Sequence, residues 1–199
     1  MNEIIINEKI SYIKACEQPL SADIGIIRDG DSIWLYDVGM GEESFSCLPR
    51  EEYRVVLSHF HTDHVGNIER VNAREIFASA ETCRHIRRGT VVRESLQFGN
   101  VRIFPLPSSH AQGSLGLEVD GQYAFVGDGI YSKDAGDWYV FNVQLLQAEI
   151  ETLKGLKAAY LLVSHCKGLV RSKEEVISAL EMIYRMRKPN DPFIYMKKR

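Results

Sequence analysis

The chain has 199 residues, of which 45% are hydrophobic and 26% are charged, and its formal net charge is −3. This length and composition fit one globular domain with a sizeable core, and they exclude a disordered chain. The weak negative charge gives no overall basic field for nucleic acid, and no apolar stretch is long enough to span a bilayer.

The predicted elements of the first half alternate between strands and helices, with a turn at Asp29-Gly30-Asp31. An opening meander is expected at 3–14, 22–28 and 32–37. It is followed by a short helix over 42–47, a strand at 54–58, a helix that begins near Asp63 or His64, a strand at 74–78, and a helix over 80–88 that Gly89 stops.

The second half repeats this alternation. Its expected strands are 101–106, 114–119 and 122–127, with a hairpin turn at Asp120-Gly121 between the last two. The apolar stripe of 142–156 predicts an amphipathic helix, which leads to a strand at 160–164. Ser172 opens the last long helix, and a short strand near 192–195 follows.

The N-terminus and the cysteines indicate a reducing compartment. Residues 1–4 lack the basic, apolar and small segments of a signal peptide. The four cysteines, Cys16, Cys47, Cys83 and Cys166, form no CxxC pair and no dense disulfide framework. We therefore expect a cytoplasmic protein.

Three of the six histidines lie in the hexapeptide 59–64, which reads His-Phe-His-Thr-Asp-His. Because this segment follows the strand-like run 55–57, His59 and His61 are expected on the same side of the chain, converging on one ion. Asp63 and His64 fall where the chain must turn and are placed for a second ion. Neutral imidazole and carboxylate suit zinc, and also iron, manganese or cobalt.

This HxHxDH segment resembles the signature of the metallo-β-lactamase fold superfamily. That family completes its site with a later His, Asp and His, each on a loop after a strand, and His110, Asp128 and His165 occupy such positions. Upstream, residues 34–39 (Trp-Leu-Tyr-Asp-Val-Gly) are similar to the family's first motif. Its aspartate, here Asp37, supports the metal-binding loops without coordinating.

The resemblance implies an α+β fold, a four-layer αββα sandwich in which residues 1–199 form a single domain. It also implies two metal ions, one of them bound by three imidazoles and the other by a mixed set that shares one bridging carboxylate. The first ion takes His59, His61 and His110, the second takes Asp63, His64 and His165, and Asp128 bridges them.

The activity implied by the resemblance is that of a dinuclear hydrolase in which a hydroxide shared by two Zn²⁺ ions attacks the substrate. Iron or manganese also fits these ligands. Asp63 and Asp128 are the expected catalytic residues, because Asp63 orients the hydroxide and Asp128 bridges the ions. The expected substrate is a small ester, thioester or lactone, with no nucleic acid or membrane partner. The sequence does not indicate an oligomeric state.

Several alternatives stay open. Relatives with the same ligands include phosphodiesterases and nucleases, and mononuclear iron dioxygenases use a subset of them. The loop 129–139, with Tyr131, Lys133 and Trp138, and also Lys167, either contacts the substrate or lies on the surface. The ligating imidazoles need their second ring nitrogen held. The candidates for this role, which are otherwise ordinary turn and cap residues, are Asp37, Ser58, Ser109 and Ser164.

Overall fold

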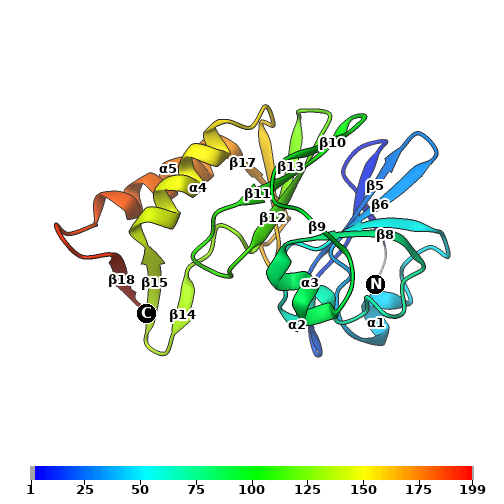
Figure 1. The fold of residues 1–199 in the computed structure, drawn as a ribbon, viewed down its shortest axis with the longest axis horizontal. Coiled ribbons are helices and arrows are strands. Elements are labelled where there is room, and N and C mark those ends of the chain that lie inside the picture. The colour runs from blue at the N-terminus through cyan, green and yellow to red at the C-terminus, as the bar shows by residue number, and fades with distance from the viewer. Residues whose placement is uncertain (1–2, 199) are drawn as a thin grey trace.

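The computed structural model describes residues 3–198, so residues 1, 2 and 199 of the expected domain lie outside the described part. The chain forms two large β-sheets that face each other (Figure 1). The first sheet has the strand order β1-β2-β5-β6-β7-β8-β9. Its strands are β1 (Glu3–Ile5), β2 (Ile10–Ile13), β5 (Ile24–Asp29), β6 (Ser32–Tyr36), β7 (Tyr53–Val56), β8 (Ala73–Ala78) and β9 (Thr90–Val91).

The second sheet is built from the later half of the chain and has the order β10-β11-β12-β13-β16-β17. Asp120 and Gly121, at the turn between its third and fourth strands in that order, both have positive φ (53° and 63°), as a tight hairpin turn requires. The strands are β10 (Leu96–Phe98), β11 (Val101–Leu106), β12 (Ser114–Val119), β13 (Tyr123–Gly127), β16 (Tyr160–Val163) and β17 (Val170–Ser172).

The main core lies between the two sheets and follows from the alternation of side chains along each strand. On β6, Trp34 and Tyr36 face this inner core, whereas Leu35 between them belongs to the core on the opposite side of the sheet. Across the interface, the ring of Phe125 packs against Gly25, where an added Cβ would lie 2.4 Å from the ring. Glycine at this position therefore sets how closely the sheets approach.

Helices cover the outer faces and complete four layers. The first sheet carries α1 (Gly41–Phe45), α2 (Thr62–Val65) and α3 (Ala80–Ile86), and the second carries α4 (Val143–Lys154) and α5 (Lys173–Arg185). This arrangement confirms the expected α+β class and αββα layering. None of the described helices has both the length and the apolar character needed to cross a bilayer.

The segment 129–139 differs from expectation, because part of it folds as a hairpin rather than a loop. Its strands β14 (Lys133–Ala135) and β15 (Trp138–Asn142) join β18 (Phe193–Lys197) in a separate three-stranded sheet. The predicted strand at 3–14 is likewise a hairpin, β1 with β2, and β3 (Cys16–Glu17) with β4 (Leu20–Ser21) forms a further small one. The short strands β9, β10 and β17 were also not expected from the sequence.

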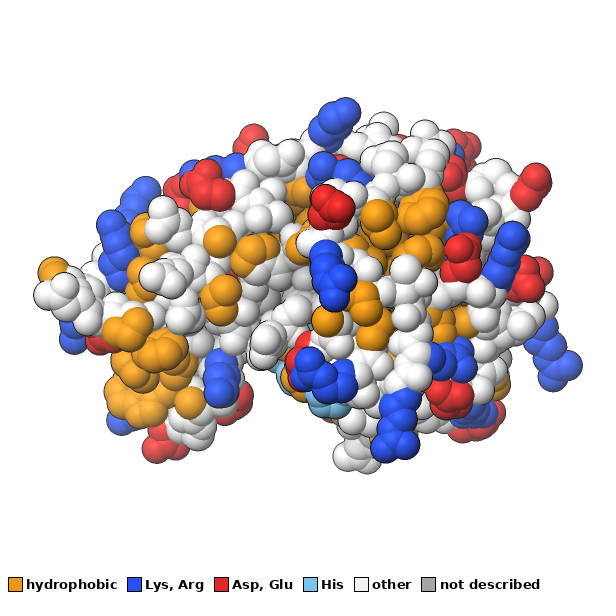
Figure 2. Space-filling view, viewed as in Figure 1, with side chains coloured by type: hydrophobic (Ala, Val, Ile, Leu, Met, Phe, Trp, Pro, Cys, Tyr) orange, Lys and Arg blue, Asp and Glu red, His pale blue; other side chains and the backbone are white. Residues whose placement is uncertain are grey.

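The three-stranded sheet projects beside α4 and α5, away from the two large sheets (Figure 1). Its surface carries a cluster of exposed aromatic side chains: Trp138, Tyr139, Phe193 and Tyr195. The space-filling view shows an apolar patch over this sheet and a hollow between it and the part of the molecule that carries α2 and α3, with histidine side chains at the edge of the hollow (Figure 2).

Candidate metal centre

Seven side chains predicted as metal ligands come together at one end of the sandwich. Four segments supply them, and each follows the carboxyl end of a strand: β7, β11, β13 or β16. Asp63 and His64 lie on α2, directly after the loop that carries His59 and His61. Within each group, one nitrogen or oxygen atom from every member lies within 4.8 Å of the others. The first group is His59, His61 and His110, and the second is Asp63, His64, Asp128 and His165.

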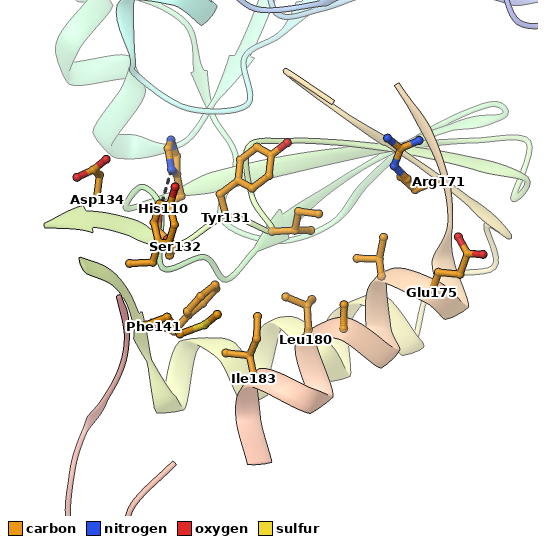
Figure 3. A pocket seen from close by; sticks show the side chains of 14 residues that line it. His110, Tyr131, Ser132, Asp134, Phe141, Arg171, Glu175, Leu180 and Ile183 are labelled. Carbon is orange, nitrogen blue, oxygen red and sulfur yellow. Dashed lines mark hydrogen bonds between the residues drawn. The ribbon is translucent and has the colours of Figure 1, made fainter. Parts of the chain in front are cut away.

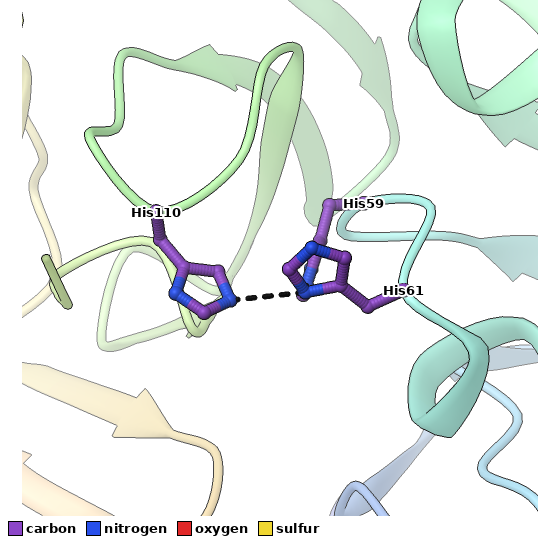
Figure 4. A group of neighbouring side chains, drawn as sticks. All are labelled: His59, His61 and His110. Carbon is purple, nitrogen blue, oxygen red and sulfur yellow. Dashed lines mark hydrogen bonds between the residues drawn. The ribbon is translucent and has the colours of Figure 1, made fainter. Parts of the chain in front are cut away.

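In the first group the imidazole nitrogens converge on one point (Figure 4). His59 Nε2 and His110 Nε2 lie 2.9 and 3.1 Å from His61 Nδ1. Burial, followed by the neighbouring imidazoles, lowers the pKa of His59, and burial together with His110 lowers the pKa of His61. Both rings are therefore neutral at physiological pH, which is the form that binds a metal ion.

The outer nitrogens of two of these rings are held, which fixes how the rings face the group. The single proton of the Ser58 hydroxyl goes to Asp37 Oδ2 at 2.8 Å, so the Ser58 oxygen accepts from His59 Nδ1 at 2.9 Å. His110 Nδ1 donates to the carbonyl of Ser132 at 3.3 Å. In both residues the unprotonated Nε2 atom is left to face the group.

The second group brings two carboxylates against two imidazoles. Asp63 Oδ2 lies 3.0 Å from His165 Nε2 and 3.5 Å from His64 Nε2. Asp128 Oδ2 lies 3.4 Å from His64 Nε2 and also 3.5 Å from His110 Nε2 of the first group. The carboxylate of Asp128 therefore stands between the two groups.

In the second group, the carboxylates and the imidazoles shift one another's pKa values toward the charged forms. Burial alone would lower the pKa of His64, but the carboxylates of Asp37 and Asp128 raise it to about 10. Burial likewise acts to raise the pKa of Asp63 and of Asp128, and the nearby imidazoles outweigh it and lower both. The hydrogen bond with Asp63 raises the pKa of His165. In the metal-free protein the two carboxylates are thus ionised around a positive charge.

Two buried atoms of the site fit the presence of a cation. His64 Nε2 and Asp128 Oδ1 are shielded from solvent and have no hydrogen-bond partner among the described residues. Buried polar atoms without a partner are costly, and metal coordination satisfies both. A donor set of imidazole nitrogens and carboxylate oxygens suits zinc, and also iron or manganese. The residues present therefore fit a pair of divalent ions.

Asp37 belongs to neither group, but it accepts hydrogen bonds from residues that carry or support the ligands. Its Oδ1 atom accepts the backbone N–H of Ser58 at 2.7 Å, and its Oδ2 atom accepts from His64 Nδ1 at 2.7 Å. The residue is fully buried and has φ 63°, a left-handed conformation that is uncommon outside glycine and that concentrates at functional sites. Asp37 thereby fixes the tautomer of His64 and aims its Nε2 atom at the second group.

Two positioning residues were not predicted. Asp23 Oδ2 accepts the backbone N–H of His165 at 2.9 Å, and His165 has a positive φ of 57°. Ser108 Oγ accepts the backbone N–H of His110 at 3.0 Å and donates to the carbonyl of Gly129. Both act on the backbone of a ligand, and such contacts leave no spacing in the sequence that could have identified them.

The remaining expectations for supporting residues have mixed outcomes. Ser164 Oγ accepts the backbone N–H of Asp23 at 3.1 Å, so it reaches the site through that residue. Ser109 does not support a ligand, because its hydroxyl accepts the backbone N–H of Asn142 at 3.0 Å instead. Cys166 contacts Arg171 and packs against the core under α4 and α5.

The fold is similar to several solved structures. A chemotaxis sensor determined as a peroxy diiron species matches with a TM-score of 0.71 at 15% identity, covering 92% of this chain and 94% of that one. A metallo-β-lactamase motif mutant from Cronobacter sakazakii gives 0.68 at 13% identity, over 93% and 96%. An archaeal metallo-β-lactamase superfamily protein from Sulfolobus tokodaii gives 0.60 at 17% identity, over 93% and 90%.

No protein-family model and no curated protein matches the sequence. At identities this low the structural matches establish architecture, while activity has to be argued from the site itself. The His/Asp cluster itself offers two sets of donor atoms that could each hold a divalent metal ion. The resemblance that the HxHxDH segment indicated is confirmed: this chain has the metallo-β-lactamase fold.

Proposed function

We propose that the protein is a dinuclear metal-dependent hydrolase that binds two Zn²⁺ ions, one in each ligand group. The observation that carries the proposal is the position of Asp128. Its Oδ2 atom lies 3.5 Å from His110 Nε2 of the first group and 3.4 Å from His64 Nε2 of the second. A carboxylate within reach of both groups is what a paired-metal site needs.

The remaining ligands divide between the ions according to the groups. His59, His61 and His110 would hold one ion, Asp63, His64 and His165 would hold the other, and Asp128 is within reach of both groups. When bound, such a pair of cations lowers the pKa of a shared water toward about 7 and polarises a substrate oxygen.

The residues of the site then have distinct tasks. Asp63 is ionised and half-buried beside His165, where its carboxylate accepts a hydrogen bond from the attacking water and orients it. The oxygen of that water bonds to the acyl carbon, and the bond from this carbon to the leaving oxygen or sulfur breaks. One proton of the water ends on the leaving group, and solvent takes the other as the acid product ionises. The proposed substrate is a small ester, thioester or lactone.

The test is a substrate panel run on protein whose metal content has been measured. Thioesters, lactones, a β-lactam and bis-p-nitrophenyl phosphate form the panel, and close to two zinc ions per chain are expected. Activity on the phosphodiester alone would replace acyl hydrolysis by phosphodiesterase chemistry.

Asp128→Asn is the decisive variant. Because it removes the charge that joins the groups, we expect kcat to fall at least about a hundredfold. Asp120→Asn is the matched control, since Asp120 lies on a turn and pairs with Lys9. Full activity of Asp128→Asn at unchanged metal content would contradict a dinuclear mechanism.

One observation favours a second candidate, an oxygen-reacting iron enzyme. Among the similar structures is the chemotaxis sensor determined as a peroxy diiron species, and the ligands of this chain also accept iron. Elemental analysis that finds iron and no zinc, with oxygen uptake by the reduced protein, would favour this candidate over the hydrolase.

We further infer a cytoplasmic location. Within residues 3–198, the four cysteines form no disulfide, as is usual for a protein of a reducing compartment. Fractionation of cells that express the protein tests this inference.

A further inference from the structure

A large cavity opens next to the first ligand group. Its volume is about 660 Å³, within the range of small-molecule sites. His110 lies at one side, together with Ser132 and Asp134 of the segment that follows Asp128 (Figure 3). The opposite side is formed by α5 and by Phe141 of β15 (Figure 3). One residue, His110, therefore belongs both to the proposed metal site and to the cavity.

The cavity is lined mainly by hydrocarbon. Its apolar residues come from the segment after Asp128, from β15, from α5 and from β18: Ile130, Phe141, Val176, Leu180, Ile183 and Met196. Phe141 and Leu180 are almost completely buried, so the surface they offer is set by packing in the core beneath. An apolar ligand gains free energy in such a cavity in proportion to the apolar area it removes from water.

The charged groups of the cavity do not suit a polyanion. They are Asp134, Glu175 and Arg171, so carboxylates outnumber cations. The Arg171 guanidinium is engaged already, donating to the carbonyls of Val170 and Lys167 and to Cys166 Sγ. A nucleic-acid backbone is bound chiefly through free basic side chains. These observations favour an uncharged apolar ligand over a phosphodiester chain.

Hydrogen bonds also connect the wall of the cavity to the candidate metal ligands. The Ser132 carbonyl, in its wall, accepts the hydrogen bond from His110 Nδ1. Tyr131, another wall residue, donates its hydroxyl proton to the carbonyl of Ser164, which precedes His165, at 2.8 Å. Whatever fills the cavity thus touches residues that position ligands of both groups.

We propose that this cavity binds the acyl chain of the substrate, so that the protein acts on medium-chain acyl esters, thioesters or lactones. The chain lies between α5 and the β14–β15 hairpin, with its carbonyl carbon beside His110. This inference rests on the proposed hydrolase function for its chemistry, whereas its binding component can be measured without any turnover.

Ala179→Trp tests the cavity with little risk to the fold. Ala179 lines the cavity from α5 and is itself exposed, so an indole there fills space without disturbing the core. Ser178→Trp is the matched control, because Ser178 is the exposed neighbour and does not line the cavity. Ile183→Ala is a third variant, which enlarges the cavity by shortening a side chain that lines it.

Two measurements are made on each protein. The first is the binding of octanamide, which the enzyme does not readily hydrolyse, by calorimetry on metal-free and zinc-loaded protein. The second is kcat/KM for acetyl, butyryl, octanoyl and dodecanoyl thioesters of one common thiol. We expect octanamide to bind both forms, and the octanoyl thioester to exceed the acetyl thioester by about tenfold or more, since each buried methylene adds affinity.

In Ala179→Trp, octanamide binding should be lost and the ratio of the octanoyl to the acetyl rate should fall to about one. Ser178→Trp should behave as the unmodified protein, and Ile183→Ala should shift the preference toward dodecanoyl. Equal rates for all chain lengths, or an octanoyl preference untouched by Ala179→Trp, would overturn the cavity assignment and leave the hydrolase standing. Octanamide binding without hydrolysis of any acyl substrate would instead overturn the hydrolase and support the cavity.

Discussion

At the scale of single residues, the hydrogen bonds of Asp37 orient two of the candidate metal ligands. Its carboxylate holds His64 Nδ1 on one oxygen and the backbone of Ser58 on the other. Ser58 in turn holds His59. One buried side chain therefore orients an imidazole in each ligand group, although it belongs to neither.

The variant Asp37→Asn keeps the size of this side chain and removes its charge. Because asparagine offers one acceptor oxygen, it cannot accept from both His64 Nδ1 and the backbone N–H of Ser58, and we expect the affinity for zinc to fall by about 10–100-fold. Competition with a chromophoric chelator measures this affinity, and circular dichroism checks that the variant is folded. Asp29→Asn, at an outer turn of the first sheet, is the control. Undiminished zinc affinity would refute the role of Asp37.

The site could be predicted from the sequence where its residues carry the chemistry themselves. His59, His61, Asp63 and His64 stand in one hexapeptide, and His110, Asp128 and His165 each follow a strand-like run, so both features are visible in the sequence. Asp23 and Ser108 were not predictable, because they contact the backbone of a ligand from positions that only the tertiary fold brings near.

Among the secondary-structure elements, α4 contains an unusual buried acid. Glu149 lies on the face of the helix that packs against the second sheet, and its exposed fraction is 0%. Neither carboxylate oxygen has a hydrogen-bond partner among the described residues. Burial raises the pKa of Glu149 well above its ordinary value.

This acid makes the stability of the fold depend on pH. Since the pKa is raised in the folded state, the folded protein binds more protons than the unfolded chain. Stability conferred by the neutral acid is therefore present at low pH and is lost as pH rises from the unfolded pKa through the folded one. Glu149→Leu should raise the free energy of unfolding by about 1–3 kcal/mol near pH 8, with a smaller gain near pH 5.

Urea denaturation at the two pH values measures the effect. Glu151→Leu is the control on the same helix, because the Glu151 side chain is 69% exposed and its replacement should change stability by less than about 0.5 kcal/mol. A gain that is equal at both pH values would mean that packing, and not ionisation, explains it.

The elements that were predicted correctly are those whose pattern is local. The apolar stripe of α4 and the short strand-like runs of β11 to β13, with the turn at Asp120-Gly121, indicate the type of these elements, and the structure has them close to the expected bounds. The hairpin β14–β15 was not predicted, because all three residues of β14 are exposed and β15 takes its second neighbour, β18, from far along the chain. A strand without a buried face carries no apolar pattern in its own residues.

At the scale of the whole molecule, both ligand groups combine residues from the two halves. His59, His61, Asp63 and His64 extend from the first sheet, and the other three ligands extend from the second. Bound metal would therefore link the sheets at one end of the sandwich.

Removal of metal should accordingly destabilise the fold. An ion present at a hundredfold excess over its Kd stabilises the folded state by about 2.7 kcal/mol, which for a chain of this size corresponds to roughly 5–10 °C in Tm. Calorimetry before and after dialysis against a chelator measures this shift, and restored zinc should reverse it. An identical Tm with and without metal would contradict a link between the sheets.

The division of each ligand group between the sheets also makes the centre a reporter of assembly. Neither sheet alone presents a complete ligand group. If cobalt(II) replaces zinc, the visible absorbance of the fully coordinated ion would therefore develop only after the two halves have docked. Rapid-mixing absorbance could then time that docking apart from the growth of β-structure seen by circular dichroism. The order in which the layers come together would be legible from a colour change.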